Sequence, residues 1–367
     1  MGEPRIVYVV GTRPNFVKMA PVIAELWARL PAARHVLVHT GQHYDRLMSQ
    51  VFLDTLGVPE PDYTLGVGSG THAKQTARVM ERIEPVLELE RPDAVVVPGD
   101  VNSTLAAALV AVKLGIPIAH VESGLRSFDR SMPEEVNRIV ADAFALHLFV
   151  HCHDAIANLT TEGVSKGRIH FVGNTMIDSL VAMEDRFRAA ETYKRFGLAA
   201  GRYLLVTLHR PALVDGPLLN EVLLRLEAVS RELPVLFPVH PRTRKMLERV
   251  PSSRRLLLTQ PLGYLDFLSL EAAAAAVLTD SGGVQEETTH LGVPCFTLRD
   301  NTERPVTVSE GTNTLLGLDP ARIDDILPTL DRVHAPASRP ELWDGHAAVR
   351  VAEVLERTLV ARAMEYA

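Results

Sequence analysis

Acidic and basic side chains recur where the short apolar runs of this chain end. Asp100 follows the run AVVVP, Glu122 follows IPIAHV, and Arg13 and Lys18 follow IVYVV. Carboxylates can exchange protons with a substrate, and clustered cations can hold an anionic group. Because ligands of open α/β sheets bind outside the carboxyl ends of the strands, this recurrence predicts a shared site. Further polar residues that follow apolar runs are Gln42, His43, His209, Arg210, His240, Ser281, Gly282 and Gly283.

Glu134 has two interpretations. Within SMPEEVNR, Ser131 and Glu134 match a capping box, Pro133 matches a helix start, and Glu134 can pair with Arg138 one turn later. Local sequence therefore favours a structural role. The alternative is that Glu134 is a third carboxylate of the site.

The segment TDSGGVQEE also has two interpretations. Backbone N–H groups at Ser281, Gly282 and Gly283 can cradle a phosphate at a helix N-terminus, or Asp280 or Ser281 can be an ordinary N-cap. An acid at Glu287 suits the hydroxyl groups of a ribose better than a phosphate. Arg13, Lys18, Arg210 and Arg304 can supply the charge that a diphosphate needs.

The first strand-to-helix turn contains Gly11 but not the GxGxxG pattern of dinucleotide-binding proteins. This argues against a bound nicotinamide dinucleotide, and we expect no cofactor. His151 and His153 flank Cys152, but residues at i and i+2 on a strand point to opposite faces, so we expect no metal site there.

Composition excludes several classes of function. The formal net charge is −7, so the chain has no basic surplus for binding nucleic acid. No apolar stretch approaches the length that spans a membrane, and the N-terminal residues lack the layout of a signal peptide. The two cysteines form no disulfide framework, which favours a reducing compartment. We expect a cytoplasmic protein.

The element pattern predicts an α/β protein with two doubly wound, Rossmann-like domains. Apolar runs at 6–10, 35–39, 94–98, 116–121, 146–150 and 169–172 alternate with segments of helical period. The pattern restarts with runs at 203–208, 235–240, 256–260, 275–280 and 294–298. The first run of each half is followed by a basic residue and Pro, in GTRP and LHRP, where we expect a helix to begin. The predicted domains are 1–172 and 173–344, followed by a C-terminal helix at 345–367.

Ten motifs together resemble the UDP-N-acetylglucosamine 2-epimerase family, in its non-hydrolysing bacterial type. They are GTRPNFVKMAPV, TGQHYD, PGDVNSTLAAAL, HVESGLRS, MPEEVNR, LHRP, PLGYLDF, TDSGGVQEE, GVPCFTLRDNTERP and EGTN, between about residues 5 and 317. The resemblance implies a fold of the glycosyltransferase-B type, an active site in the interdomain cleft, and a C-terminal helix that returns to the N-terminal domain. It also implies a homodimer that uses neither metal nor nicotinamide.

The resemblance further implies that UDP-N-acetylglucosamine (UDP-GlcNAc) and UDP-N-acetylmannosamine (UDP-ManNAc) interconvert through elimination of UDP and its re-addition. The matching catalytic positions are Asp100, Glu122, Glu134 and His209. We assign Glu122 and Glu134 as base and acid at C2, Asp100 as an orienting or proton-relay carboxylate, and His209 as the stabiliser of departing UDP. The expected UDP-binding residues are Arg13, Lys18, Arg138, Arg210, Phe267, Ser281, Gly282, Gly283, Glu287 and Arg304.

Many bacterial members bind a second UDP-GlcNAc as an activator. The positions that match this site are Gln42, His43, Gln75, Glu135 and His240, although Asp45 and Lys74 depart from the pattern of some members. Asn15 and the segment HRPALVD also depart from the usual pattern. Three alternatives stay open: a hydrolysing epimerase that releases free sugar, a retaining glycosyltransferase, and a catalytically silent UDP-sugar-binding protein.

Overall fold

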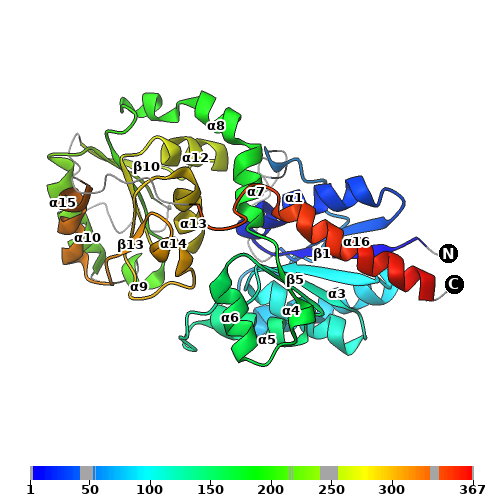
Figure 1. Cartoon of the computed structure of the whole chain (residues 1–367). Coiled ribbons are helices and arrows are strands. Elements are labelled where there is room, and N and C mark those ends of the chain that lie inside the picture. The colour runs from blue at the N-terminus through cyan, green and yellow to red at the C-terminus, as the bar shows by residue number, and fades with distance from the viewer. Residues whose placement is uncertain are drawn as a thin grey trace. The chain divides into compact units, whose positions relative to one another are not determined.

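The chain folds into two compact units, Met1–Val181 with Glu341–Ala367 (unit 1) and Ala182–Pro340 (unit 2). The computed structural model (Figure 1) describes residues 3–41, 53, 55–214, 216, 218–239, 255–330 and 339–365. Among these described residues, each unit contains one sheet whose strands pair in parallel. Helices connect the strands, so both units are doubly wound α/β structures, as the sequence predicts.

The sheet of unit 1 has seven strands in the order β3-β2-β1-β4-β5-β6-β7. The strand order reverses between β1 and β4, the two neighbours at the centre of the sheet. The strands are β1 (Arg5–Val10), β2 (Arg34–His39), β3 (Tyr63–Thr64), β4 (Ala94–Pro98), β5 (Ile118–Val121), β6 (His147–Val150) and β7 (Ile169–Phe171). The helices are α1 (Arg13–Arg29), α3 (His72–Glu90), α4 (Asn102–Lys113), α5 (Pro133–Phe144), α6 (His153–Thr161), α7 (Thr175–Ala182) and α16 (Ala347–Glu365), with the 3-10 turn η1 (Lys166–Arg168).

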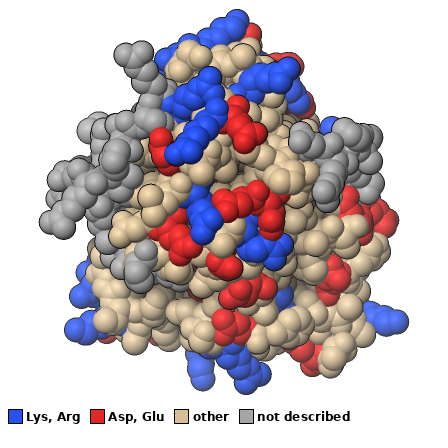
Figure 2. Space-filling view, turned by 90° about the vertical axis from the view of Figure 1, so that its left-hand side faces the viewer, with Lys and Arg blue, Asp and Glu red and all other residues tan. Residues whose placement is uncertain are grey.

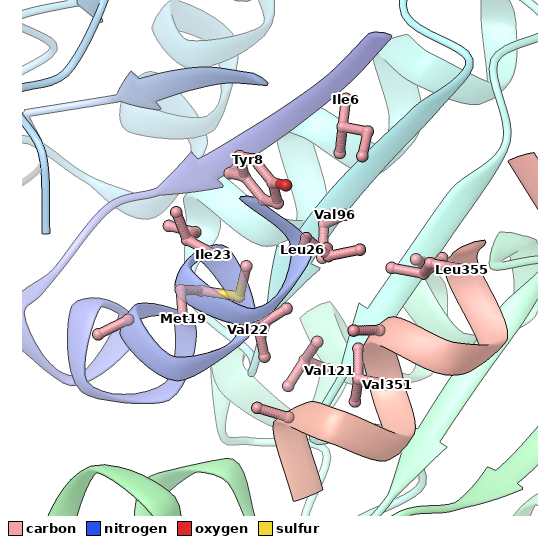
Figure 3. Close-up of a cluster of buried hydrophobic side chains, with 14 of the residues drawn as sticks. Ile6, Tyr8, Met19, Val22, Ile23, Leu26, Val96, Val121, Val351 and Leu355 are labelled. Atoms are coloured by element: carbon pink, nitrogen blue, oxygen red, sulfur yellow. The ribbon is translucent and has the colours of Figure 1, made fainter. Parts of the chain in front are cut away.

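Alternation along the apolar strands distributes side chains between two buried faces of this sheet. Ile6, Tyr8 and Val96 lie on the face covered by α1 and α16, where they pack with Val351 and Leu355 (Figure 3). Full burial of one such aliphatic side chain contributes about 1.5–3 kcal/mol. Helix α16 is therefore part of the same core as β1 and α1.

The segment before α16 is fixed to unit 1 by specific contacts. The indole Nε1 of Trp343, a fully buried side chain, donates to the carbonyl of His151 over 2.8 Å. Gly173 has φ +88°, and a Cβ at this position would lie 2.0 Å from the Leu342 carbonyl oxygen. Only glycine allows this close backbone approach.

Helix α7 also belongs to unit 1. Asp178 of α7 accepts hydrogen bonds from the backbone N–H groups of Ala347 and Ala348 at the start of α16. Ser179 donates to the Val17 carbonyl in α1 over 2.6 Å. These contacts explain why the units divide after Val181, downstream of the boundary that the sequence predicts at 172/173.

The sheet of unit 2 has six strands in the order β10-β9-β8-β11-β12-β13, which again reverses beside its first strand. The strands are β8 (Leu204–Thr207), β9 (Val235–Pro238), β10 (Leu256–Thr259), β11 (Ala276–Thr279), β12 (Cys295–Thr297) and β13 (Asn313–Leu315). The helices are α8 (Glu184–Ala190), α9 (Pro211–Val214), α10 (Leu218–Ser230), α12 (Tyr264–Ala272), α13 (Gly282–Leu291), α14 (Val306–Ser309) and α15 (Ile326–Leu330), with 3-10 helices η2 (Thr192–Phe196) and η3 (Pro320–Asp325).

Helices begin at GTRP and LHRP, as the sequence predicts. Helix α1 starts at Arg13 and α9 starts at Pro211. Each of the eleven predicted apolar runs overlaps a strand. Lys, Arg, Asp and Glu side chains are interspersed on the described surface of the face shown in Figure 2. Among the described residues, no helix is both long enough and apolar enough to cross a bilayer.

The Asp178 contact gives a pH-dependent prediction for unit 1. Burial raises the pKa of Asp178 to about 6, against an ordinary value near 3.8. The folded state therefore holds this proton more tightly than the unfolded state, and stability is lost as pH rises through about 6. Asp178→Asn keeps an oxygen that can accept from Ala347 and Ala348 but does not titrate.

We therefore expect the unfolding free energy of Asp178→Asn, relative to the parent chain, to rise by about 2 kcal/mol between about pH 4 and about pH 8. Urea titration followed by tryptophan fluorescence measures this, because Trp27 and Trp343 both lie in unit 1. Asp154→Asn, at an exposed acid of α6, is the control. An identical pH profile for Asp178→Asn and the parent chain would contradict the prediction.

Candidate active site

The candidate residues of unit 1 gather where its strand order reverses. Asn15, in the first turn of α1, accepts hydrogen bonds from the backbone N–H groups of Gly11 and Thr12, at 3.0 and 3.1 Å. Its side-chain amide donates to the carbonyl of Pro98, the last residue of β4. Asn15 thus ties the turn after β1 to the turn after β4, the place where doubly wound sheets bind ligands.

Lys18 and Glu122 form a buried ion pair beside this turn. Lys18 Nζ lies 2.6 Å from Glu122 Oε2, with only 8% and 5% of the two side chains exposed. A Cβ added to Gly99, which has φ +61°, would lie 3.4 Å from Lys18 Nζ and 3.8 Å from Glu122 Oε1. A side chain larger than that of glycine in the turn after β4 would therefore contact both partners of the pair.

Glu122 has an unusual backbone conformation. It follows β5 directly and has φ +64°, in the left-handed region. This conformation costs a residue with a side chain about 1–2 kcal/mol. Strain of this kind is concentrated at functional sites, where the surrounding contacts hold a side chain in one direction.

Arg138 connects Asp100 to the start of α5. Its guanidinium forms ion pairs with Asp100 and with Glu135, and Arg138 is 1% exposed. The amide of Asn137 donates to the Asp100 carbonyl over 2.9 Å and to Asn102 Oδ1 over 3.2 Å. Helix α5 therefore fixes both the side chain and the backbone of Asp100.

Glu134 lies in the first turn of α5 and is partly exposed. The helix begins at Pro133, as predicted, but its N-cap residue is Met132 rather than Ser131. The hydroxyl of Ser131 donates to Asp129 over 2.6 Å. The predicted Glu134–Arg138 ion pair is wrong, because the Arg138 guanidinium meets Asp100 and Glu135. The structural interpretation of Glu134 thus loses its two main contacts.

The candidate residues of unit 2 gather at the corresponding reversal between β8 and β11. His209 Nδ1 lies 2.8 Å from Asp280 Oδ1, and the backbone N–H groups of His209 and Arg210 donate to the same carboxylate. Burial acts to raise the pKa of Asp280, but the hydrogen bonds from His209 and Arg210 lower it below its ordinary value. Because a carboxylate only accepts, Asp280 holds His209 with its hydrogen on Nδ1.

Helix α13 begins directly after this carboxylate. Ser281 is its N-cap residue, although its side chain makes no capping hydrogen bond. A Cβ at Gly282 would lie 2.4 Å from Nη1 of Arg304, so glycine allows the guanidinium to approach the first turn. Arg304 also lies 3.0 Å from Glu286 and 3.4 Å from Glu303. The positive end of the helix and a buried guanidinium are thus close together.

The other predicted UDP contacts of unit 2 lie in α12 and α13. Glu287 is buried, and its Oε1 accepts a hydrogen bond of 2.7 Å from the Tyr264 hydroxyl. Phe267 is partly exposed and packs against the apolar cluster that contains Leu205 and Val277. Arg210 contacts Asp280 and lies 3.8 Å from Glu303. In unit 1, Arg13 is exposed at the start of α1.

The predicted activator site is described in part. Gln75 is buried between the Gly68 carbonyl and Asn102, at 2.9 and 2.7 Å. Glu135 accepts from the backbone N–H groups of Ser127 and Phe128 and pairs with Arg138. The other predicted positions, Gln42, His43 and His240, lie outside the described residues. No group of three or more metal-ligating side chains occurs in the described part of the chain.

The sequence interpretation missed residues that support the carboxylates. From the sequence, Asp280 is a candidate only for an N-cap, and neither Asn102 nor Asn137 is a candidate. His120 was missed as well, although its Nδ1 and Nε2 lie 2.7 Å from Asp142 Oδ1 and from the Gly99 carbonyl oxygen, respectively. The available signal was the position of these residues within the motifs PGDVNST, EEVNR and HVESG.

The buried Lys18–Glu122 pair gives a stability prediction. Lys18→Met leaves the Glu122 carboxylate buried without its cation, and we expect the unfolding free energy of unit 1 to fall by about 3 kcal/mol. Lys18→Met combined with Glu122→Gln removes both charges and should recover at least about 1 kcal/mol of that loss. Urea titration followed by tryptophan fluorescence tests this cycle. Additive losses in the double variant would show that the two side chains do not interact.

Comparison with known proteins identifies the family. The model of the family "UDP-N-acetylglucosamine 2-epimerase" matches residues 27–356. The UDP-N-acetylglucosamine 2-epimerase of Methanococcus maripaludis is 42% identical over 334 residues, or 87% of this chain and 89% of that protein. The UDP-2,3-diacetamido-2,3-dideoxy-D-glucuronate 2-epimerase of Pseudomonas aeruginosa is 42% identical over 318 residues, or 85% of this chain and 88% of that protein.

Solved structures agree with this assignment. The Methanocaldococcus jannaschii UDP-GlcNAc 2-epimerase, solved in complex with UDP-GlcNAc and UDP, matches with a TM-score of 0.87 and 38% identity, covering 96% of this chain and 99% of that one. A spinosyn rhamnosyltransferase, 14% identical with a TM-score of 0.53 over 97% of this chain and 99% of that one, shares the fold alone. The fold is thus glycosyltransferase-B-like, and the chain belongs to the UDP-N-acetylglucosamine 2-epimerase family.

Proposed function

We propose that this epimerase interconverts UDP-GlcNAc and UDP-ManNAc by inverting C2 of the sugar. The observation that carries the proposal is the pair of charge-compensated carboxylates, Glu122 with Lys18 and Asp100 with Arg138, at the strand-order reversal of unit 1. The 42% identity to an archaeal enzyme named for this substrate supports it. The M. jannaschii structure, which holds UDP-GlcNAc and UDP, supports the same ligand class.

The chemistry follows from the substrate. The C2–H bond of such a sugar has no adjacent carbonyl group, so its proton is barely acidic. Inversion by elimination avoids this difficulty: a base removes the C2 proton, a C1=C2 double bond forms, and the C1–O bond breaks with its electron pair leaving on UDP. UDP then adds back to C1 while C2 receives a proton on the opposite face. This route requires an acid and a base on two faces, with positive charge at the diphosphate.

We assign Glu122 and Glu134 to the two proton transfers at C2. The fixed direction of Glu122, imposed by its left-handed backbone and by Lys18, suits a residue that must meet one face of the sugar. Glu134 is partly exposed in the first turn of α5, as a group that exchanges protons with a ligand must be. Asp100 is assigned to orient the sugar or to relay the proton.

We propose that positively charged groups bind the diphosphate of UDP. His209, with its hydrogen held on Nδ1 by Asp280, stabilises the departing UDP, and Arg13, Lys18 and Arg210 supply further positive charge. The N-terminus of α13, with Arg304 at its first turn, is the phosphate cradle in this proposal. Phe267 borders the uracil, and Glu287 accepts from the ribose hydroxyl groups. We propose homodimers as the working assembly and Gln75 and Glu135 as parts of an activator site.

A second substrate has specific support. The P. aeruginosa relative, named for a diacetamido-dideoxy-glucuronate, is as similar to this chain as the M. maripaludis enzyme. Both names describe inversion at C2 of a UDP-linked acetamido sugar. The two candidates differ at C3 and C6 of the sugar, where one carries a second acetamido group and a carboxylate.

Solvent deuterium incorporation tests the proposed reaction. Purified protein is incubated with UDP-GlcNAc in heavy water, and the products are followed by proton NMR. We expect UDP-ManNAc that carries deuterium at C2, because the abstracted proton exchanges before the glycal is reprotonated. Free ManNAc as the main product would select the hydrolysing alternative. Turnover of UDP-2,3-diacetamido-2,3-dideoxy-glucuronate alone would select the second substrate, and sugar transfer to an added acceptor without C2 exchange would refute an epimerase.

Variants at the two proton-transfer residues test their roles. Glu122→Gln and Glu134→Gln keep the size of the side chain and remove its ability to transfer a proton. We expect each to lower kcat at least about 100-fold, with UDP affinity, measured by calorimetry, kept within about threefold. Glu84→Gln, at an exposed acid of α3, is the matched control. A near-normal kcat in either variant removes that residue from the mechanism.

A further inference from the structure

His120 is a fully buried histidine of β5, and Glu122 follows it two residues later. Both of its ring nitrogens have hydrogen-bond partners. Nδ1 lies 2.7 Å from Asp142 Oδ1 in α5, and Nε2 lies 2.7 Å from the carbonyl oxygen of Gly99 in the turn after β4. Asp100 follows Gly99 directly. His120 thus joins the segment that carries Glu122 to the turn that carries Asp100.

The partners of His120 leave two protonation states for its ring. A carbonyl oxygen only accepts hydrogen bonds, so Nε2 must carry a hydrogen. If Asp142 is ionised, its carboxylate also only accepts, and Nδ1 must carry a hydrogen as well. The ring is then a positively charged imidazolium. If Asp142 is protonated, Nδ1 accepts from it and the ring is neutral.

The other contacts of Asp142 decide between these states. Its Oδ2 accepts from the backbone N–H of Gly124 over 3.0 Å and from the Arg126 guanidinium over 2.8 Å. Burial acts to raise the pKa of Asp142, but its contacts with His120 and Arg126 lower the pKa below its ordinary value. Arg126 in turn pairs with Glu162 of α6 over 2.6 Å. These contacts favour the ionised carboxylate and, with it, a second hydrogen on His120.

The Asp142 carboxylate fixes the chain on both sides of Glu122. It binds His120, two residues before Glu122, and the N–H of Gly124, two residues after it. Gly124 is also held by α6, where the side-chain amide of Asn158 donates to its carbonyl over 3.0 Å. Asp142 thus supports the left-handed backbone conformation of Glu122.

The turn that carries Asp100 is fixed by β5. The backbone N–H of Gly99 donates to the carbonyl of Val121 over 2.9 Å, and the carbonyl of Gly99 accepts from His120. Because the peptide group between Gly99 and Asp100 is planar, the hydrogen bond from His120 sets the direction in which Asp100 leaves the turn. Gly99 is buried, and a buried carbonyl that loses its donor costs about 1–3 kcal/mol.

We propose that His120 is a buried imidazolium that positions Asp100 relative to Glu122. One of its N–H groups holds the turn before Asp100, and the other binds the carboxylate of Asp142, which holds the segment around Glu122. This inference rests on the proposed function, in which Glu122 transfers a proton at C2 and Asp100 orients the sugar or relays the proton.

Nitrogen-15 NMR of histidine-labelled protein tests the imidazolium without any ligand. At about pH 7.5, exposed histidines are largely neutral. We expect both ring nitrogens of His120 to show the chemical shifts and hydrogen couplings of N–H groups, because both face acceptors. Their resonances are identified by their absence from His120→Gln. His153→Asn, at an exposed histidine of α6, is the control.

Two substitutions separate the contacts of His120. Nε2 of glutamine lies as many bonds from Cβ as Nε2 of histidine, so His120→Gln keeps a donor for Gly99. Nδ2 of asparagine corresponds in the same way to Nδ1 of histidine, so His120→Asn keeps a donor for Asp142 and loses the donor for Gly99. Because Asp142 has two further donors, the segment around Glu122 should be held in both variants.

Epimerase kinetics measure the positioning role. We expect His120→Asn to lower kcat at least about tenfold, because a displaced Asp100 misplaces the sugar. His120→Gln should keep kcat within about threefold of the parent chain, and KM should change less than about threefold in both variants. Each kcat is expressed per UDP-binding site counted by calorimetry, so unfolded protein does not lower it. If His120→Asn binds no UDP, His120→Met, which is larger and donates to neither partner, replaces it with the same expectation.

The outcomes separate the inference from the proposed function. A ring nitrogen of His120 without a hydrogen refutes the imidazolium, whether or not the protein is an epimerase. A normal kcat in His120→Asn, or an equal loss of kcat in His120→Gln, refutes the positioning role. If the parent chain epimerises neither candidate substrate, the proposed function fails and the positioning role fails with it, whereas the NMR result still decides the imidazolium.

Discussion

The reversal of strand order beside the first strand of each sheet determines where polar side chains can collect. Parallel strands place all their carboxyl ends at one edge, and connections leave β1 and β4, or β8 and β11, in opposite directions. In unit 1, Asn15 bridges the two turns at this point, and in unit 2 Asp280 does so by accepting from His209 and Arg210. Asp100, His209 and Arg210, which we assign to the reaction, follow β4 and β8 directly.

Charge compensation is the second constraint, because buried basic side chains lie next to carboxylates in both units. Lys18, Arg138 and Arg304 are each less than a tenth exposed, and each lies beside at least one carboxylate.

The sequence predicted the sheets well and their supporting contacts poorly. Runs such as IVYVV and AVVVP are apolar on both faces and reveal buried parallel strands directly. Strands β3 and β13 were missed because their sequences, YT and NTL, are too short and too polar to form an apolar run. Asp100 and Glu122 are candidate site residues because they follow such runs. Asp280 pairs with His209, and Arg138 pairs with Asp100. The residues of each pair lie far apart in the sequence, so spacing within a motif does not predict the contact.

The return of the chain to unit 1 has a consequence for how the protein is made. Unit 2 is a continuous stretch that ends at Pro340, whereas unit 1 needs α16 to cover the face formed by Ile6, Tyr8 and Val96. During synthesis, β1 and α1 must therefore wait for α16. Unit 2 can complete its core first, and unit 1 closes only when α16 has been made.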